Sequence, residues 1–322
     1  MTELTVSDLQ GLSVNYYMTL ISFSLLVHEY CLTFAMEVER FWRANRFTWA
    51  VFFFYLNRYL TLFGHLPVIV EYFWYSTADG KNKVGHQSNR QALIQFTCSD
   101  RCRSSHHIYL CSAKLTPYTS CRDLQSYHQY FAVTVQIWVS TLLIMRMYAL
   151  YDRSRRVLAL FLGVALAAVI IACWSIFTGK EDGPTPEYFL PVGCPASLSH
   201  YAATRLAAAW GGMLVFDTLV FSMTVYKSLL LRQTSGMNLL TLMLRDGSIY
   251  FGVMIASNLG NILTFVYGGL FTRGVGTTFT NVISSVMITR LMLNLRDPQL
   301  ILGSQRSTSI SGPVFRTLVT SL

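Results

Sequence analysis

The segment Leu142–Arg156, LLIMRMYALYDRSRR, joins two long apolar runs through a short basic turn. One run reaches it from Phe131, and a second, Val157–Thr178, begins directly after it. Its basic residues are Arg146, Arg153, Arg155 and Arg156. Because short loops rich in Lys and Arg stay on the cytoplasmic side of a membrane, the segment predicts two membrane spans joined by a cytoplasmic turn. Arg146 is expected to extend its charged end towards the inner membrane face.

The composition of the whole chain agrees with this interpretation. The chain has 322 residues, of which 52% are hydrophobic and only 13% are charged. This is too apolar for a soluble domain and is typical of a multi-pass membrane protein. The net charge is +9. Since the basic residues lie between apolar runs, the charge indicates contact with the lipid bilayer and no binding of nucleic acid.

Seven apolar runs approach the length of about 20 residues that a helix needs to cross a bilayer. They cover about 14–36, 48–75, 128–151, 157–178, 205–231, 247–271 and 278–295. The first run is followed by Arg40, Arg43 and Arg46 with no basic residue before it, which places the N-terminus outside. We therefore predict an all-α integral membrane protein, a bundle of seven transmembrane helices with a cytoplasmic C-terminus.

This topology divides the chain into three parts. An outer segment, 1–13, precedes a membrane domain, 14–296, and a Ser- and Thr-rich tail, 297–322, is expected to be disordered in the cytoplasm. The predicted outer loop 76–127 is unusually long and basic and lacks periodicity. Within it, about 81–118 is expected to be loosely ordered and is a candidate artefact of the gene model, such as a translated intron.

Two cysteines in the predicted outer loops are candidates for a structural bridge. Cys121 precedes the third span and Cys194 precedes the fifth, and both are predicted to lie outside, where oxidation is permitted. We favour a disulfide between them, with two alternatives open: free thiols, or pairing with Cys98, Cys102 or Cys111. The Cys and His residues of the long loop match no strong zinc pattern, so no metal is expected.

Charged residues inside the first two spans predict a contact between them. Glu29 and Arg58 lie at similar distances from the inner ends of their helices, within roughly 5 Å in depth at 1.5 Å per residue. Because a charge in hydrocarbon requires a partner or a cavity, we expect these two residues to pair. Glu71, near the outer end of the second span, is expected at the membrane interface.

Polar residues also occur in the fifth and sixth spans. Asp217 lies near the middle of the fifth span, and Asn258 and Asn261 share one face of the sixth. Together with Glu29 and Arg58 they form a candidate polar centre. This centre either binds a ligand or holds the helices together by hydrogen bonds, and the second interpretation is favoured.

No catalytic pattern accompanies these residues. The spans contain no G-x-S-x-G motif and no H-x-x-x-H run, and the last span has no lysine to bind retinal. The sequence therefore predicts neither enzymatic activity nor a cofactor.

Several short motifs resemble those of a multi-pass membrane family of mushroom-forming fungi, known only as a domain of unknown function. His28–Thr33 is similar to its first-span signature Y-D-Y-L-L-T, and Asn57–Leu60 to its N-R-Y-L. Further similar motifs are Arg146–Tyr151, Phe216–Thr218, Leu244–Gly247 and Arg290–Arg296. The departures are Glu29 for Asp, Met147 for Thr, and the insertion 81–118. The resemblance implies a seven-helix architecture without an established activity.

These observations lead to a functional hypothesis. The chain is expected to be receptor-like, with an unknown small ligand near Arg58, Asp217, Asn258 and Asn261 and a cytoplasmic signalling partner. It lacks the D-R-Y and N-P-x-x-Y motifs of common G-protein-coupled receptors. The alternative is a transporter or channel that uses the same polar centre. The plasma membrane is the expected location.

Overall fold

The computed structural model describes residues 6–42, 48–73, 117–178, 198–235 and 238–296. These residues form helices joined by short turns, and no strand occurs among them. The helices are α1 (Val6–Glu37), which continues as one π-helical turn, η1 (Val38–Trp42), then α2 (Trp49–Phe73), α3 (Pro117–Leu150), α4 (Arg155–Thr178), α5 (His200–Ser235), α6 (Asn238–Tyr267) and α7 (Gly276–Leu295). A helix covers most of each of the seven predicted spans.

Five segments of the described chain are long and apolar enough to cross a membrane. They are Val6–Trp42, Asp123–Leu150, Arg155–Thr178, His200–Leu230 and Gly247–Tyr267. The chain is therefore a membrane protein with several apolar helices. Among the described helices, α2 and α7 fall outside this set, because α2 carries charged residues and α7 is rich in Ser, Thr and Asn.

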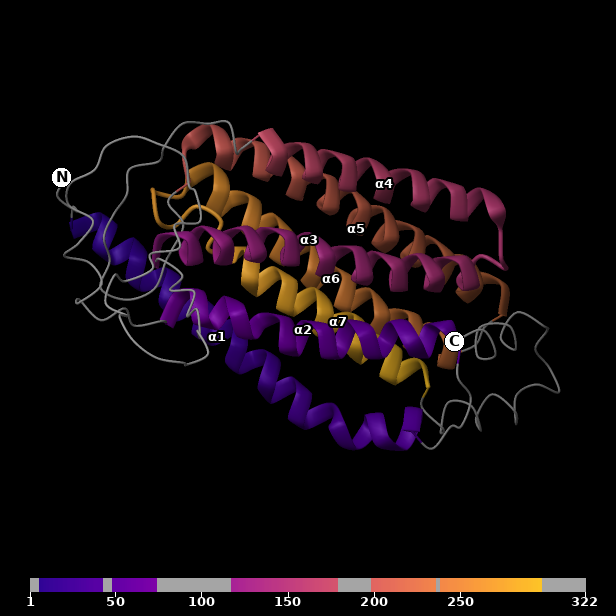
Figure 1. Ribbon diagram of the computed structural model, residues 1–322. Helices are drawn as coiled ribbons and strands as arrows, with labels where there is room; N and C mark the ends of the chain where they lie inside the picture. Colours follow the sequence, from indigo (N-terminus) through magenta and orange to yellow (C-terminus); the bar gives the residue numbers. More distant parts are fainter. Residues whose placement is uncertain (1–5, 43–47, 74–116, 179–197, 236–237, 297–322) are drawn as a thin grey trace, which may run out of the picture.

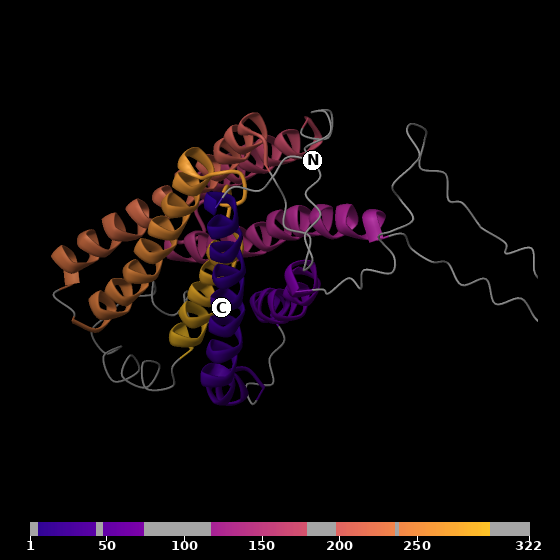
Figure 2. The same ribbon diagram turned by 90° about the vertical axis from the view of Figure 1, so that its left-hand side faces the viewer.

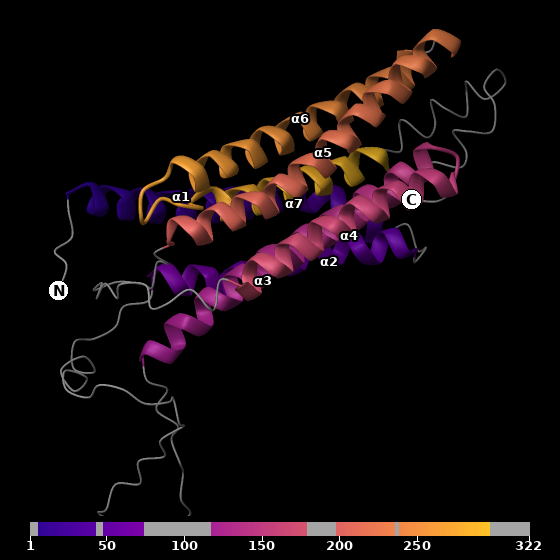
Figure 3. The same cartoon turned by 90° about the horizontal axis from the view of Figure 1, so that it is seen from above.

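The helices run side by side along one long axis (Figure 1). Each packs against the next in chain order, and α7 returns to α1, which closes the bundle. Helix α7 also packs against α2 and α3, and most of its residues are buried. We call the end where α1 begins the N-terminal end of the bundle, and the end where α7 stops the C-terminal end. Figures 2 and 3 show the bundle along and across this axis.

The main hydrophobic core joins six of the helices, α2 to α7. Phe54, Met147 and Phe161 are completely buried within it, as is Ile288 of α7. Phe41 of η1 stacks on Phe54 with ring centroids 3.9 Å apart. Large apolar side chains point outwards instead on α4, where Leu166, Ile170 and Trp174 are exposed. Such a surface is suited to contact with lipid.

The basic turn between α3 and α4 is as tight as the sequence predicts. Asp152 and Arg153 adopt positive φ angles of 50° and 59°, and the Arg153 N–H donates to the Tyr148 carbonyl over 2.9 Å. This left-handed conformation reverses the chain within a few residues. Arg153, Arg155 and Arg156 are all exposed at the C-terminal end.

The prediction for Arg146 is wrong. Its side chain is buried, 3% exposed, and its guanidinium lies 4.9 Å from the centre of the Phe251 ring of α6. Gly247 leaves the space that this requires, because a Cβ there would lie 2.6 Å from Arg146 Nη2. Arg146 is thus held between helices instead of reaching the membrane face.

The structure describes only some of the other basic residues near the C-terminal end of the bundle. Arg40 Nη1 donates to the Leu293 carbonyl of α7 over 2.8 Å, so this residue ties η1 to α7. Arg43 and Arg46 lie outside the described residues, as do most of the loop 76–127 and the tail 297–322. The Cys121–Cys194 prediction also lies outside them, because Cys194 and the side chain of Cys121 are not described.

Candidate functional site

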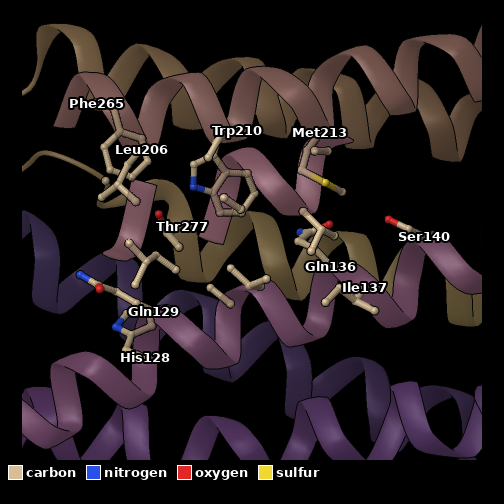
Figure 4. A pocket seen from close by; sticks show the side chains of 18 of the residues that line it. His128, Gln129, Gln136, Ile137, Ser140, Leu206, Trp210, Met213, Phe265 and Thr277 are labelled. Carbon is tan, nitrogen blue, oxygen red and sulfur yellow. The ribbon is translucent and has the colours of Figure 1, made fainter. Parts of the chain in front are cut away.

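A cavity of about 320 Å³ lies between α3, α4 and α5, nearer the N-terminal end of the bundle (Figure 4). Small side chains from three helices leave this space open. They are Ala132 of α3, Ala165, Ala168 and Ala172 of α4, and Ala209 of α5. Larger apolar groups, including Leu206, Met213 and Phe265, complete most of the lining. Its size is at the lower end of the range for small-molecule sites, about 300–1,000 Å³.

One end of the cavity is bounded by a buried acid and a histidine. Glu71 of α2 is 1% exposed, and its Oε2 lies 3.0 Å from His128 Nδ1 of α3. His128 Nε2 lies 3.1 Å from the Thr278 hydroxyl of α7. The sequence analysis expected Glu71 near the outer end of the second span, and it lies close to the end of α2 with its side chain buried against α3. It is sealed between helices because His128 supplies a partner there.

Three buried side chains bring polar atoms to the apolar part of the cavity. Gln136 is 5% exposed, and its Nε2 donates to Asn281 Oδ1 of α7 over 2.8 Å. Its carbonyl oxygen, Oε1, has no hydrogen-bond partner among the described residues. Within the same part of the chain, no hydrogen bond is formed by the side chains of Ser140, 6% exposed, or Trp210, 8% exposed. Figure 4 shows Trp210 of α5 and Ser140 of α3 at separate places along the cavity, with Gln136 between them.

The residues expected to form one polar centre belong to separate networks. Arg58 Nε lies 2.7 Å from Glu37 Oε2, and Arg58 also donates to the Thr33 hydroxyl over 2.7 Å and to the Tyr30 carbonyl over 3.0 Å. Arg58 is 5% exposed and Glu37 is completely buried. The hydroxyl of Tyr59 donates to Glu37 Oε1 over 3.0 Å. The charge of Arg58 is thus neutralised within α1 and α2.

The expected pair between Glu29 and Arg58 is wrong. Glu29 instead accepts two hydrogen bonds from Arg290 of α7, over 2.7 and 2.8 Å. Glu37 follows Glu29 by eight residues, which places it about 80° further around α1 after two turns. Glu29 consequently faces α7 while Glu37 faces α2. Counting residues along the two helices gave similar depths for Glu29 and Arg58, but it did not show that Glu29 faces α7.

The remaining residues of the expected centre lie between α5, α6 and α7. Asn258 Nδ2 donates to Asp217 Oδ2 over 2.5 Å, which links α6 to α5. Asn261 Oδ1 lies 3.4 Å from the Thr277 hydroxyl of α7. Neither Asp217 nor the two asparagines line the cavity of 320 Å³. The geometry of all three is that of hydrogen-bonded contacts between helices.

A second, much smaller cavity touches Glu29, Arg58 and Arg290. Its volume is about 20 Å³. This is close to the space that one water molecule needs, about 10–15 Å³ by the same kind of measure. It is too small for an organic ligand. In the described part of the chain, no group of three or more His, Cys, Asp or Glu residues could hold a metal ion.

The comparison with known protein families found a match within the first two helices. Residues 17–63 match the model of a family of unknown function (DUF6533). The matched segment includes Glu29, Glu37 and Arg58, so it contains the buried pair between α1 and α2. It also includes the motifs His28–Thr33 and Asn57–Leu60, whereas the later motifs lie outside it. No curated protein and no solved structure matches the chain.

The sequence analysis did not identify the residues that line the cavity. His128 stands at the start of a predicted span, where a polar residue needs no explanation. Gln136 was the available signal, because a single amide within the apolar run 131–145 needs a partner in hydrocarbon. That partner, Asn281, is distant in the sequence and could be identified only from the fold.

Proposed function

We propose that this chain is a receptor-like protein that spans the membrane seven times and binds a small ligand without converting it. The observation that carries the proposal is the cavity between α3, α4 and α5. Its lining is mostly apolar, and a few buried polar groups give it direction, as is usual for small-molecule sites. We also propose that the protein lies in the plasma membrane. We further propose that its resemblance to the family extends over residues 28–296.

The packing explains how α2 and α7 could also span the membrane. Helix α7 packs against α1, α2, α3 and α6, so its polar residues contact protein instead of lipid. The charge of Arg58 is paired with that of Glu37, and Glu71 Oε2 lies 3.0 Å from His128 Nδ1. Paired and enclosed polar groups are tolerated at membrane depth. The exposed arginines after α3 favour a cytoplasmic C-terminal end.

The proposed topology predicts opposite locations for the two ends of the chain. An N-glycosylation acceptor inserted before Val6 should be glycosylated in a eukaryotic host, and one inserted after Arg296 should not. Glycosidase sensitivity on gels measures this directly. Modification of both acceptors, or of neither, would contradict an odd number of spans with the N-terminus outside.

We expect a small molecule to stay bound in the cavity when the protein is purified. A larger side chain in the cavity should displace this molecule. Ala165 lines the cavity, whereas Ala167, on the same helix, is exposed and does not. We expect Ala165→Phe to lower the fraction of protein with a bound molecule about tenfold, since overpacking costs about 1–3 kcal/mol. Native mass spectrometry of protein extracted in mild detergent measures the bound fraction.

Ala167→Phe is the matched control, because it adds the same ring on the lipid-facing side of α4. It should retain the wild-type level of bound molecule. Equal loss in both variants, or an empty wild-type protein, would contradict a ligand site at this cavity. Accumulation of the identified molecule inside liposomes that contain the protein would favour transport over sensing.

A further inference from the structure

We propose that the cavity binds a single-chain amphiphile with one negative charge, a long-chain carboxylate whose headgroup lies at Arg273 and whose chain lies between α3, α4 and α5. This inference rests on the proposed function, because it names the class of ligand for the same cavity. Three observations carry it: the unbalanced charge of Arg273, the shape of the lining, and the exposure of one wall.

Arg273 brings a positive charge to the cavity. It lies in the connection between α6 and α7, at the N-terminal end of the bundle (Figure 1), and lines the cavity. Its Nη1 donates to the Leu198 carbonyl over 2.7 Å, and its Nε to the Gly268 carbonyl over 3.2 Å. These neutral acceptors hold the guanidinium in place without balancing its charge, which arginine keeps in proteins. Its three other N–H groups have no partner among the described residues.

The acidic residue of the cavity has a different neighbour. Glu71 is the one Asp or Glu in the described lining, and its Oε2 lies 3.0 Å from His128 Nδ1. Within the described chain, no ion pair joins it to Arg273. A ligand carboxylate can therefore pair with Arg273, and charge-assisted bonds of this kind are strong. One cation balances one negative charge, whereas a phosphate monoester carries about −1.5 to −2.

The lining is long and narrow. Lining residues recur at intervals of three or four along one face of α3, from Gln125 to Ile144, which is roughly 28 Å at 1.5 Å per residue. Figure 4 shows His128 and Gln129 at one end of this row and Ser140 at the other. A volume of about 320 Å³ drawn out along such a row fits one extended chain better than a compact ring system.

One wall of the cavity reaches the outer surface of the bundle. Ile137 of α3 is 38% exposed, and Leu162 and Leu166 of α4 are 51% and 61% exposed, yet all three line the cavity. They lie away from the ends of their helices, so in a bilayer they face hydrocarbon. Arg273 lies beyond the apolar span Gly247–Tyr267. A bound amphiphile thus keeps its charged end near the membrane surface and its chain in the apolar layer.

Photolabelling of the full chain in phosphatidylcholine vesicles tests the ligand class. The probe is palmitic acid with a diazirine on its chain, compared with the alcohol and the alkylammonium of the same chain at a pH where the acid is ionised. We expect the acid to label cavity peptides of α3 and α4 with saturation and with competition by unlabelled palmitate. It should bind at least about tenfold more tightly than the other two probes, since only the acid forms a charge-assisted bond with Arg273.

Four variants locate the headgroup and the chain. Arg273→Met should weaken the apparent affinity for the acid about tenfold to hundredfold and leave that for the alcohol nearly unchanged. Arg273→Lys keeps the charge and should weaken it less than Arg273→Met does. Ala165→Phe leaves Arg273 intact and should still lower labelling by the acid, whereas Ala167→Phe should not. Glu71→Gln should not weaken binding of the acid, because the ligand pairs with Arg273.

The outcomes separate this inference from the proposal on which it depends. If the alcohol or the ammonium binds the cavity as tightly as the acid, the ligand class is wrong and the site remains. Loss of acid binding in Glu71→Gln, or an equal effect of Arg273→Met on all three probes, would overturn the headgroup position. If none of the probes labels the cavity, and no molecule accompanies the purified protein, the site itself is refuted.

Discussion

Arg58→Met is expected to destabilise the folded protein by about 3–5 kcal/mol, because it leaves the Glu37 carboxylate buried without its partner. Glu37 is completely buried and lies 2.7 Å from Arg58. The remaining donors to this carboxylate, the Tyr59 hydroxyl and the Trp42 indole at 3.0 and 3.2 Å, are uncharged. They cannot neutralise its charge. The measurement is the free energy of unfolding in mild detergent, or the shift of the melting temperature.

Two further variants make this prediction specific. The double variant Arg58→Met/Glu37→Leu should recover much of the lost stability, since removal of both charges leaves no unpaired ion. Arg290→Met should destabilise the protein less than Arg58→Met, because Arg290 is 37% exposed and its partner Glu29 is 14% exposed. Equal losses for the two single variants would show that burial does not set the cost of breaking these ion pairs.

Gly64→Ala is expected to destabilise the protein by about 1–3 kcal/mol through overpacking between α2 and α3. A Cβ at this position would lie 2.1 Å from Cε2 of Phe131. The Phe131 ring has little freedom to move, since it is buried and stacks on Tyr127 with centroids 5.6 Å apart. The His65 ring also packs edge-on against the Phe131 ring, with the ring centroids 5.0 Å apart. Thermal unfolding monitored by tryptophan fluorescence measures the loss.

Gly163→Ala is the matched control for this substitution. Gly163 is on α4, and a Cβ there meets nothing within 4 Å. In an open helical position, Ala is favoured over Gly by about 0.8–1 kcal/mol, so the control should be neutral or stabilising. The sign of the effect should therefore differ between the two glycines. In combination with Phe131→Leu, Gly64→Ala should cost less than it does alone, and full additivity would argue against the predicted clash.

Side-chain partners were predicted less well than helices. The five residues of the expected polar centre are all buried or half-buried in helices, yet they form separate contacts, and none lines the large cavity. Depth along a helix follows from counting residues, but the direction of a side chain depends on the rotation and tilt of each helix. Glu29 and Arg58 illustrate this, because their depths are similar and their partners are different.

By itself, the sequence determined that this chain forms several long apolar helices and that α3 and α4 meet in a tight basic turn. Those features follow from local properties: the length of each apolar run and the arginines that end it. Only the tertiary structure decided that Arg146 is buried, that Glu37 is the partner of Arg58, and that alanines from three helices leave a cavity. These features depend on which faces of distant helices meet, and that is set by the packing of the whole bundle.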